Sequence, residues 1–215
     1  MQEFTDGNLK ILCDGPAGSF ANNLYILIDT ETNEAAFVDA PGEPEKSIAL
    51  ANAAGVRPSQ ILLTHSHMDH TAGIEALQAE FGCTLVADAA EPWLKDGQPD
   101  RAITHDEEIL VGRIAFRALS VPGHTPGSTT FVHGKHAFVG DTLFPGGPGR
   151  TPSNAALQQE LVSITTHLFA LDGATTVYPG HGDRTTIAAS IAEHAIFAAK
   201  PHDPELKGDV TWANS

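Results

Sequence analysis

Four side chains that can bind a metal follow an apolar run in the first third of the chain. His65, His67, Asp69 and His70 fall within the stretch LLTHSHMDHTAG, residues 62–73. Imidazole and carboxylate groups are typical ligands of zinc and of iron in proteins. A single histidine after a strand is usually a hydrogen-bonded structural residue, but three within six residues favour a metal site.

The spacing in this cluster separates two groups of ligands. In an extended chain alternate side chains share a side, so His65 and His67 can reach one ion. Asp69 and His70 come at the turn into the next helical pattern, which displaces them toward a second position. This H-x-H spacing differs from the i, i+4 pair of histidines that helical zinc sites use.

Three more candidate ligands also end apolar runs. His124 follows ALSVPG, Asp141 follows HAFVG and His181 follows TTVYPG. Loops at the carboxyl ends of strands meet in one crevice of layered α/β folds, so these residues can lie together. Prolines beside His124 and His181 stiffen their loops, which suits ligands of fixed orientation.

Catalytic zinc commonly keeps three protein ligands and one position open to water. The seven candidates divide accordingly into two sets and one shared residue. The predicted sets are His65, His67 and His124 for one ion, Asp69, His70 and His181 for the other, and Asp141 as a bridge between them.

Short apolar segments and helical patterns must position these ligands. The segments rich in β-branched and aromatic residues predict strands at 9–13, 22–29, 35–39, 60–64, 84–88, 114–121, 128–133, 136–140 and 175–179. Apolar residues at three and four spacing, with serine or threonine caps and closing glycines, predict helices at 43–55, 71–82, 153–171 and 185–200. Together with a hairpin-rich middle, this alternation indicates α/β or α+β layers with mixed sheets.

Composition limits the classes of function. The formal net charge is −15 and only 12 lysines and arginines are spread along 215 residues, so nucleic acid is not an expected partner. No apolar run approaches the length of a spanning helix, and the N-terminus does not resemble a signal peptide, so we expect no membrane association and a cytoplasmic location. Length and composition predict one domain over residues 1–215.

The cysteines do not provide a metal site. Cys13 and Cys83 lie far apart and form no C-x-x-C pair. Structural zinc usually has four closed ligands, often cysteines, so a structural metal site or a non-catalytic metal-binding protein is the weaker alternative.

Four motifs carry a resemblance to a known family. THSHMDH (64–70), PGHTPGS (122–128), GDTLF (140–144) and PGHG (179–182) resemble the metallo-β-lactamase superfamily in order and spacing, across roughly residues 20–190. Within it, GDTLFPGGPGR resembles the glyoxalase II branch and its short single-domain relatives. The resemblance implies an α+β fold, the metallo-β-lactamase-like αβ/βα four-layer sandwich of two mixed β-sheets flanked by helices. It also implies that all seven candidates are metal ligands.

The resemblance implies a hydrolase with two divalent metal ions, zinc first and iron or manganese as options. A metal-activated hydroxide would attack a thioester, or a related ester or lactone, as in hydroxyacylglutathione hydrolases. Asp69, beside the hydroxide, would be the catalytic residue that holds or takes its proton. The partner is then a small-molecule substrate, and Arg150 is a candidate contact for its carboxylate.

This chain departs from glyoxalase II proper at several positions. Only 34 residues follow His181, whereas glyoxalase II carries a helical C-terminal domain that helps to hold glutathione. The tyrosine usual after the last histidine is replaced by Asp183, and the aromatic residues after the glycine loop by Thr151 and Pro152. The substrate thiol is therefore left open.

A second enzyme class shares these motifs. Persulfide dioxygenases of the same fold resemble this chain in H-x-H-x-D-H, in PGHT and in the GRT of residues 149–151. Their single iron is held by the residues that match His65, His124 and Asp141, a set of two histidines and one carboxylate. The GDTLFPGG loop resembles the hydrolases more closely, so hydrolysis is the first hypothesis.

Other segments carry weaker expectations. Thr125 and Ser128 either orient the His124 imidazole or cap a turn. The segment 89–106 is read as a loop or short helix over the site, and the tail 200–215 as a segment packed across the surface near the site mouth. Six histidines match no ligand position: His105, His133, His136, His167, His194 and His202.

Overall fold

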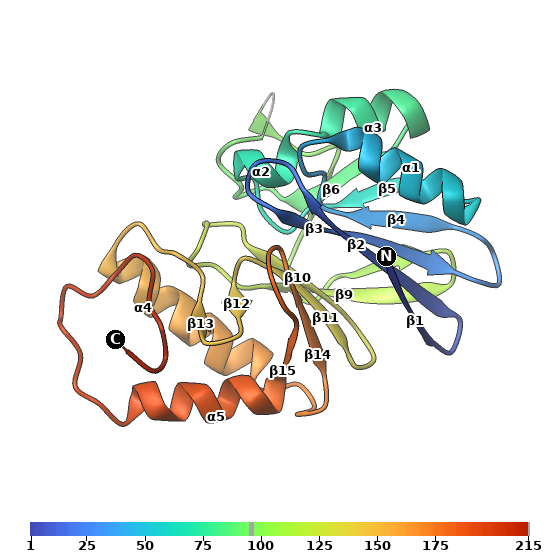
Figure 1. Ribbon diagram of the computed structural model, residues 1–215. Helices are drawn as coiled ribbons and strands as arrows, with labels where there is room; N and C mark the ends of the chain where they lie inside the picture. The colour runs from blue at the N-terminus through green and yellow to red at the C-terminus, as the bar shows by residue number, and fades with distance from the viewer. Residues whose placement is uncertain (95–96, 215) are drawn as a thin grey trace.

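The computed structural model describes residues 1–94 and 97–214, and these form two β-sheets with helices on their outer faces (Figure 1). The first sheet runs in sequence order through β1 (Gln2–Asp6), β2 (Leu9–Ala17), β3 (Asn22–Asp29), β4 (Ala35–Val38), β5 (Gln60–Leu62), β6 (Thr84–Asp88) and β7 (Arg101–Ile103). The second has the order β15 (Thr185–Thr186), β14 (Thr176–Pro179), β11 (His136–Gly140), β10 (Thr129–His133), β9 (Ile114–Ser120) and β8 (Glu108–Val111).

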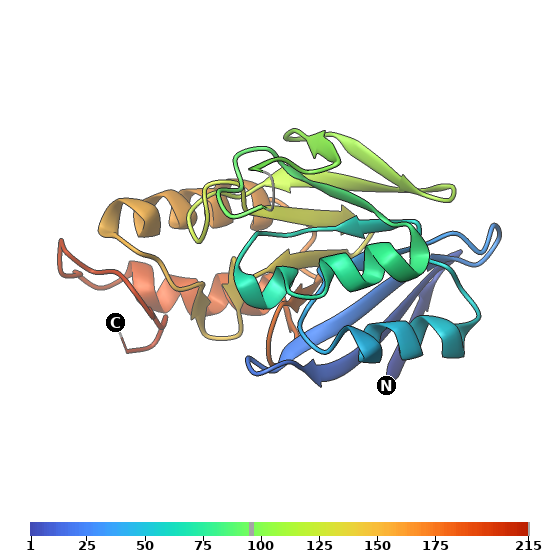
Figure 2. The same cartoon turned by 90° about the horizontal axis from the view of Figure 1, so that it is seen from above.

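Two helices pack on each sheet. α1 (Pro44–Ala54) and α3 (Ile74–Phe81) cover the first sheet, whereas α4 (Asn154–Ser163) and α5 (Ile187–Ala198) cover the second (Figures 1 and 2). The capping predictions are confirmed: α1 and α3 end at Gly55 and Gly82 in the left-handed conformation. The Ser153 and Thr186 side chains accept hydrogen bonds from the first turns of α4 and α5.

Three apolar layers separate these elements. Along β3, Leu24 and Ile26 face α1 and α3, whereas Tyr25 and Leu27 face the second sheet. A strand buried on both faces reads as a continuous apolar run, as residues 24–28 do. The outer face of the second sheet packs against α4, α5 and the tail residue Trp212. The predicted αβ/βα four-layer sandwich is therefore confirmed.

Strand direction brings the ligand loops to one edge. β4, β5, β6 and β7 pair in parallel, whereas β9, β10 and β11 are antiparallel in turn, and β14 is parallel to β11. β9, β11 and β14 thus end at the same edge of the second sheet. The loops that carry His124, Asp141 and His181 follow these three strands.

All nine predicted strands are present, and six others were not predicted. β1 is an exposed edge strand and therefore lacks an apolar pattern. β15 and the hairpin of β12 (Leu143–Phe144) with β13 (Gly147–Pro148) have two residues per strand, too few for a periodicity. The remaining two, β7 and β8, lie near the ends of their sheets.

The predicted helices are longer than those observed at two places. The pattern 71–82 is an α-helix only from Ile74 onward, as α3, because Thr71 is the last residue of a separate single turn, α2 (Met68–Thr71), and Gly73 is the N-cap of α3. The pattern 153–171 continues beyond α4 only as a short π-helix, Ile164–Leu168. Within the described part of the chain, every helix is too short or too polar to cross a bilayer.

Candidate metal centre

The loop after β5 and the turn α2 place four of the predicted ligands. His65 and His70 are fully buried, and His67 and Asp69 are partly exposed. His65 and His67 stand on the extended segment before α2, and Asp69 and His70 stand on its single turn. The change from extended chain to helix therefore points the two pairs toward different positions, as their spacing predicted.

The first predicted set comes together. The Nε2 atoms of His65 and His124 are 3.3 Å apart, and His67 Nδ1 lies 2.8 Å from His124 Nε2. Ligand atoms on one tetrahedral zinc at 2.0–2.1 Å are separated by about 3.3 Å, so this spacing suits a shared ion.

The second predicted set comes together as closely. The distance from Asp69 Oδ2 is 3.3 Å to His70 Nε2 and 3.1 Å to His181 Nε2, and the two Nε2 atoms are 3.3 Å apart. Both sets meet the distance criterion for a group that could hold a metal ion.

Asp141 lies between the two sets. One carboxylate oxygen is 3.4 Å from His70 Nε2, and the other is 3.4 Å from His181 Nε2 and 3.8 Å from His124 Nε2. The oxygen facing His70 is buried and accepts no hydrogen bond from any described residue. A buried, unpaired carboxylate oxygen facing imidazole nitrogens fits a bound cation.

Position 180 requires glycine because the backbone there passes close to the centre. A Cβ atom added to Gly180 would lie 2.4 Å from the Asp141 carboxylate and 2.5 Å from His70 Cε1. The loop before His181 can therefore reach the centre only without a side chain at position 180.

In three of the histidines the ring nitrogen that faces away from the centre has a partner. His70 Nδ1 lies 2.8 Å from Asp39 Oδ2, His124 Nδ1 donates to the Arg150 carbonyl at 2.9 Å, and His181 Nδ1 donates to the Phe20 carbonyl at 2.9 Å. These contacts place the proton on Nδ1 and leave the Nε2 lone pair for a metal.

The electrostatics of the two sets differ. Burial lowers the pKa of His124 to about 4 and holds the pKa of His65 well below its usual range. Burial also opposes the charged form of His181, yet hydrogen bonds that its ring donates to the Asp141 and Asp69 carboxylates raise its pKa to about 9. The first set therefore offers neutral imidazoles. In the second set protons are shared between imidazoles and carboxylates, and a bound cation could take the place of these protons.

Glu91 joins the two loops of the first set and was not predicted from the sequence. Its side chain is 3 % exposed and accepts hydrogen bonds from the Ser66 amide at 2.7 Å and the Ser66 hydroxyl at 2.6 Å. It also accepts one from the Thr125 hydroxyl, which contacts Ser128. Of the two roles considered for Thr125 and Ser128, the turn is observed, because His124 itself is oriented by the Arg150 carbonyl.

Part of the segment 89–106 lies over the site, but Arg101–Ile103 forms strand β7 and not the expected loop or short helix. Trp93, 58 % exposed, stacks on the His67 ring with centroids 5.0 Å apart. Residues 95 and 96 of this segment lie outside the described part. The segment thus contacts the His67 ring through Trp93 and supports the first ligand loop through Glu91.

Arg150 lines a cavity of about 530 Å³ that opens onto His124 and Asp141. Its guanidinium is largely exposed and lies 3.5 Å from the Asp209 carboxylate. The tail residues 209–211 and 213–214 line the same cavity, and the Trp212 amide donates to the Gly146 carbonyl at 2.8 Å. The expected position of the tail, near the site mouth, is thus observed for its described part.

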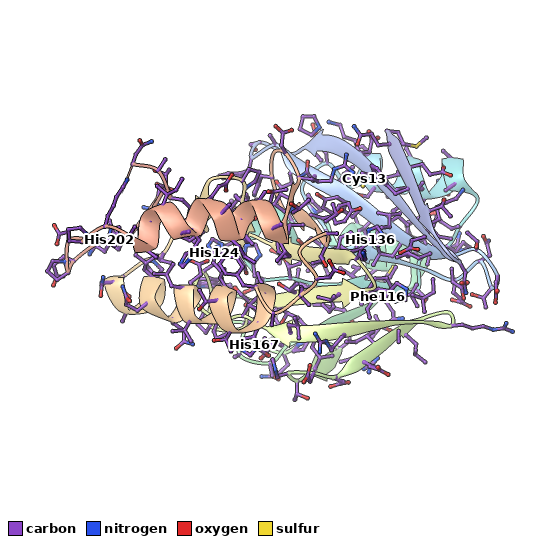
Figure 3. The ribbon with its side chains drawn as sticks, turned by 90° about the horizontal axis from the view of Figure 1, so that it is seen from below. Cys13, Phe116, His124, His136, His167 and His202 are labelled. Atoms are coloured by element: carbon purple, nitrogen blue, oxygen red, sulfur yellow. The ribbon has the colours of Figure 1, made fainter. Side chains whose placement is uncertain are left out.

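The histidines set aside in the sequence lie elsewhere. Figure 3 shows His136 on β11 and His202 after α5, both well apart from His124. His136 contacts the Tyr178 hydroxyl, and His105 and His167 contact each other. These contacts agree with structural roles.

Asn22 and Asp39, like Glu91, are site residues that the sequence analysis missed. Asp39 directly follows the apolar strand β4, which is the signal that identified four other site positions. Nothing in the local pattern distinguishes Asn22, whose amide nitrogen lies 3.0 Å from Asp69 Oδ2.

Comparisons with known proteins agree with this geometry. The family model of the metallo-β-lactamase superfamily matches residues 20–181. A hydroxyacylglutathione hydrolase of Anaeromyxobacter dehalogenans is 36% identical over 165 residues, which are 75% of this chain and 62% of the relative. Hydroxyacylglutathione hydrolase GloC of Haemophilus influenzae is 33% identical over 214 residues, 90% of this chain and 99% of the relative.

Two further matches are a relative named as a dioxygenase and a solved structure. The mitochondrial persulfide dioxygenase ETHE1 of Bos taurus is 33% identical over 174 residues, 79% of this chain and 67% of the relative. The solved structure of the BLEG-1 B3 metallo-β-lactamase covers 84% of this chain and 97% of its own, with 27% identity and a TM-score of 0.75. The fold, the two sets of candidate ligand residues and these matches lead to one conclusion: the chain belongs to the metallo-β-lactamase superfamily.

Proposed function

We propose that this chain is a binuclear metal-dependent hydrolase of thioesters, similar to hydroxyacylglutathione hydrolases, with zinc as the metal. The observation that carries the proposal is the pair of complete ligand sets at one sheet edge, with the Asp141 carboxylate directed at both. The ligands would be His65, His67 and His124 in the first position, Asp69, His70 and His181 in the second, and Asp141 shared.

The relatives support the substrate class. The Anaeromyxobacter and Haemophilus relatives are both hydroxyacylglutathione hydrolases by name. The alignment with the Haemophilus relative spans 99% of its length, so a chain of this size can carry the whole of such a protein. We extend the proposal to a single domain over residues 1–215 that acts on a small molecule in the cytoplasm.

The bound metals would supply a polarised carbonyl and a water of lowered pKa. Asp69 is the residue that would orient this water and hold its proton. Although burial opposes ionisation, hydrogen bonds with His181 and His70 hold the pKa of Asp69 well below its usual range, so the carboxylate is available as an acceptor. The Arg150 carbonyl keeps the His124 ring in place while substrate enters beside it.

Two cavities beside the centre can receive the two halves of a thioester. The cavity of about 530 Å³ carries Arg150, whose exposed ion pair with Asp209 is weak enough for a substrate carboxylate to compete with it. A second cavity, of about 410 Å³, is lined by Asp69 and by the exposed apolar side chains of Phe20 and Met68. We assign the carboxylate-bearing thiol to the first cavity and the acyl group to the second.

The test is a metal count and a substrate panel on the purified protein. We expect about two equivalents of zinc per chain, and hydrolysis of a hydroxyacylglutathione thioester ahead of simple esters. His181→Ala should keep one equivalent and lose most activity, whereas His167→Ala, away from the site, should keep both. If His181→Ala retained two equivalents, the assignment of the second position would be wrong.

Persulfide dioxygenase activity is the second candidate. It is favoured by the bovine ETHE1 match and by the proximity of His65, His124 and Asp141. His124 Nε2 lies 3.3 Å from His65 Nε2 and 3.8 Å from Asp141 Oδ2. One equivalent of iron, with oxygen uptake on addition of glutathione persulfide and no thioester hydrolysis, would replace the hydrolase proposal with this one.

A further inference from the structure

Asn22, the first residue of β3, reaches into the second ligand set. Its side chain is 1 % exposed, and its amide nitrogen lies 3.0 Å from Asp69 Oδ2, 3.3 Å from His70 Nε2 and 3.5 Å from His181 Nε2. A β-bridge to His181 fixes the backbone at this point. The end of the amide is thus near all three atoms that the proposed function assigns to one metal.

The distances describe a fourth ligand position. The three atoms of the set are 3.1–3.3 Å from one another, and ligand atoms of a tetrahedral zinc are separated by about 3.3 Å. An atom placed 3.0–3.5 Å from each of the three occupies a fourth corner of the same polyhedron. A residue that only filled space behind the ligands would not approach the atoms that face the ion.

The two ends of the Asn22 amide differ in what they can bind at this fourth position. The NH₂ group can donate to the Asp69 carboxylate but cannot bind a cation, whereas the amide oxygen can be a metal ligand. That oxygen is buried and accepts no hydrogen bond from the described residues. Rotation of the amide by half a turn exchanges the two ends, which have nearly the same shape.

We propose that Asn22 is a metal ligand of the second position, through its amide oxygen once a cation is present. The inference rests on the proposed binuclear site. With Asn22 the second position has five protein ligands, Asp69, His70, His181, Asp141 and Asn22. The first position has four, His65, His67, His124 and Asp141. The substrate carbonyl is then directed to the first position, which adjoins the cavity that carries Arg150.

Two substitutions distinguish whether Asn22 is a metal ligand or only a hydrogen-bond donor to Asp69. Asn22→Leu keeps the shape of the side chain and removes both polar atoms. Asn22→Asp keeps oxygen donors and removes the NH₂ group that donates to Asp69. Asn52→Ala, on the exposed surface of α1, is the matched control.

The measurement is zinc titration of the metal-stripped full chain against a competing chelator, with cobalt(II) absorption as a second readout. We expect two equivalents for the wild type and for Asn52→Ala. In Asn22→Leu the first affinity should be unchanged and the second weaker by about tenfold or more. The visible bands of the second cobalt should also change, because loss of a ligand alters the coordination number. Asn22→Asp should bind the second equivalent at least as tightly as the wild type.

The outcomes distinguish the two proposals. Two equivalents with wild-type affinities and cobalt spectrum in Asn22→Leu would overturn the role of Asn22 alone. Loss of the second equivalent in Asn22→Asp as well would show that Asn22 acts as a donor to Asp69, which also overturns it. Fewer than two equivalents in the wild type would overturn the binuclear site and with it this inference. Circular dichroism of each metal-free variant checks folding, and Asn22→Asp, the closer substitution, remains decisive if Asn22→Leu does not fold.

Discussion

Glu160 on α4 is a carboxylic acid that the fold buries completely, and it should make the stability of this protein depend on pH. Its side chain is 0 % exposed, and neither carboxyl oxygen has a hydrogen-bond partner among the described residues. Burial, with the charge of Asp141 added, raises the pKa of Glu160 from 4.5 to about 9, although the Gly149 amide acts in the opposite direction. The native state therefore holds a proton on Glu160 at neutral pH, whereas the unfolded chain does not.

The sign and size of the effect follow from linkage. Between pH 4.5 and 9 the native state binds one proton more at this site, so the free energy of unfolding falls as pH rises. Each pH unit in this window lowers the free energy of unfolding by about 1.4 kcal/mol. At pH 7.5 the protein is therefore less stable by roughly 4 kcal/mol than under acid conditions, as far as this one group is concerned. Glu160→Gln is neutral and of the same shape, so it should remove this dependence.

The assay is urea unfolding of the metal-loaded protein at pH 5.0, 6.5 and 7.5. The free energy of unfolding of Glu160→Gln minus that of the wild type should increase by roughly 3 kcal/mol from the lowest to the highest pH. Because the metal ligands titrate in both proteins, their contribution cancels in this difference. Glu108→Gln, an exposed position on β8, serves as the control and should show a flat difference. A flat difference for Glu160→Gln as well would refute the reasoning.

Three further predictions concern the centre and its support. Asp141→Ala should lose most of the bound metal, because the carboxylate serves both positions, and unchanged metal content by elemental analysis would contradict this. Glu91→Ala should lower the free energy of unfolding by about 2–3 kcal/mol and weaken metal binding, because the Ser66 and Thr125 donors lose a buried acceptor; equal chemical denaturation midpoints would argue against it. Gly180→Ala should reduce metal affinity without changing the secondary structure seen by circular dichroism, since the added Cβ presses on Asp141, and wild-type affinity would show that the loop can move aside.

Much of the fold could be predicted because its strands are buried on both faces. Continuous apolar runs such as 24–28 and 137–139 exist where both sides of a sheet are covered, and both lie within predicted strands. The unpredicted strands are at edges or have two residues, where packing on neighbours and not local sequence decides the conformation. The predicted helix 71–82 begins only at Ile74, and the preceding Gly73 lies where a Cβ would be 2.5 Å from the Pro41 carbonyl oxygen, a close approach that only the tertiary structure shows.

The candidate ligands were accessible from sequence because their chemistry restricts the residue types. Few side chains bind a divalent cation, and histidine or aspartate directly after an apolar run is an uncommon placement. Asp39 shared that placement and was overlooked, since it stands alone and not in a histidine-rich motif. Asn22 and Glu91 gave no signal, because amide and carboxylate side chains are common on protein surfaces.

The sequence by itself determined the residue types, their grouping by spacing and the family resemblance, since these depend on covalent order and on the alternation of side chains along a strand. Only the tertiary structure decided which atoms face one another. The parallel alignment of β9, β11 and β14 brings His124, Asp141 and His181 to one edge, and the packing of the two sheets sets them against His65 and Asp69. Tertiary packing also buries Glu160, Glu91 and Asn22, and burial changes their chemistry because it removes the water that would otherwise solvate them.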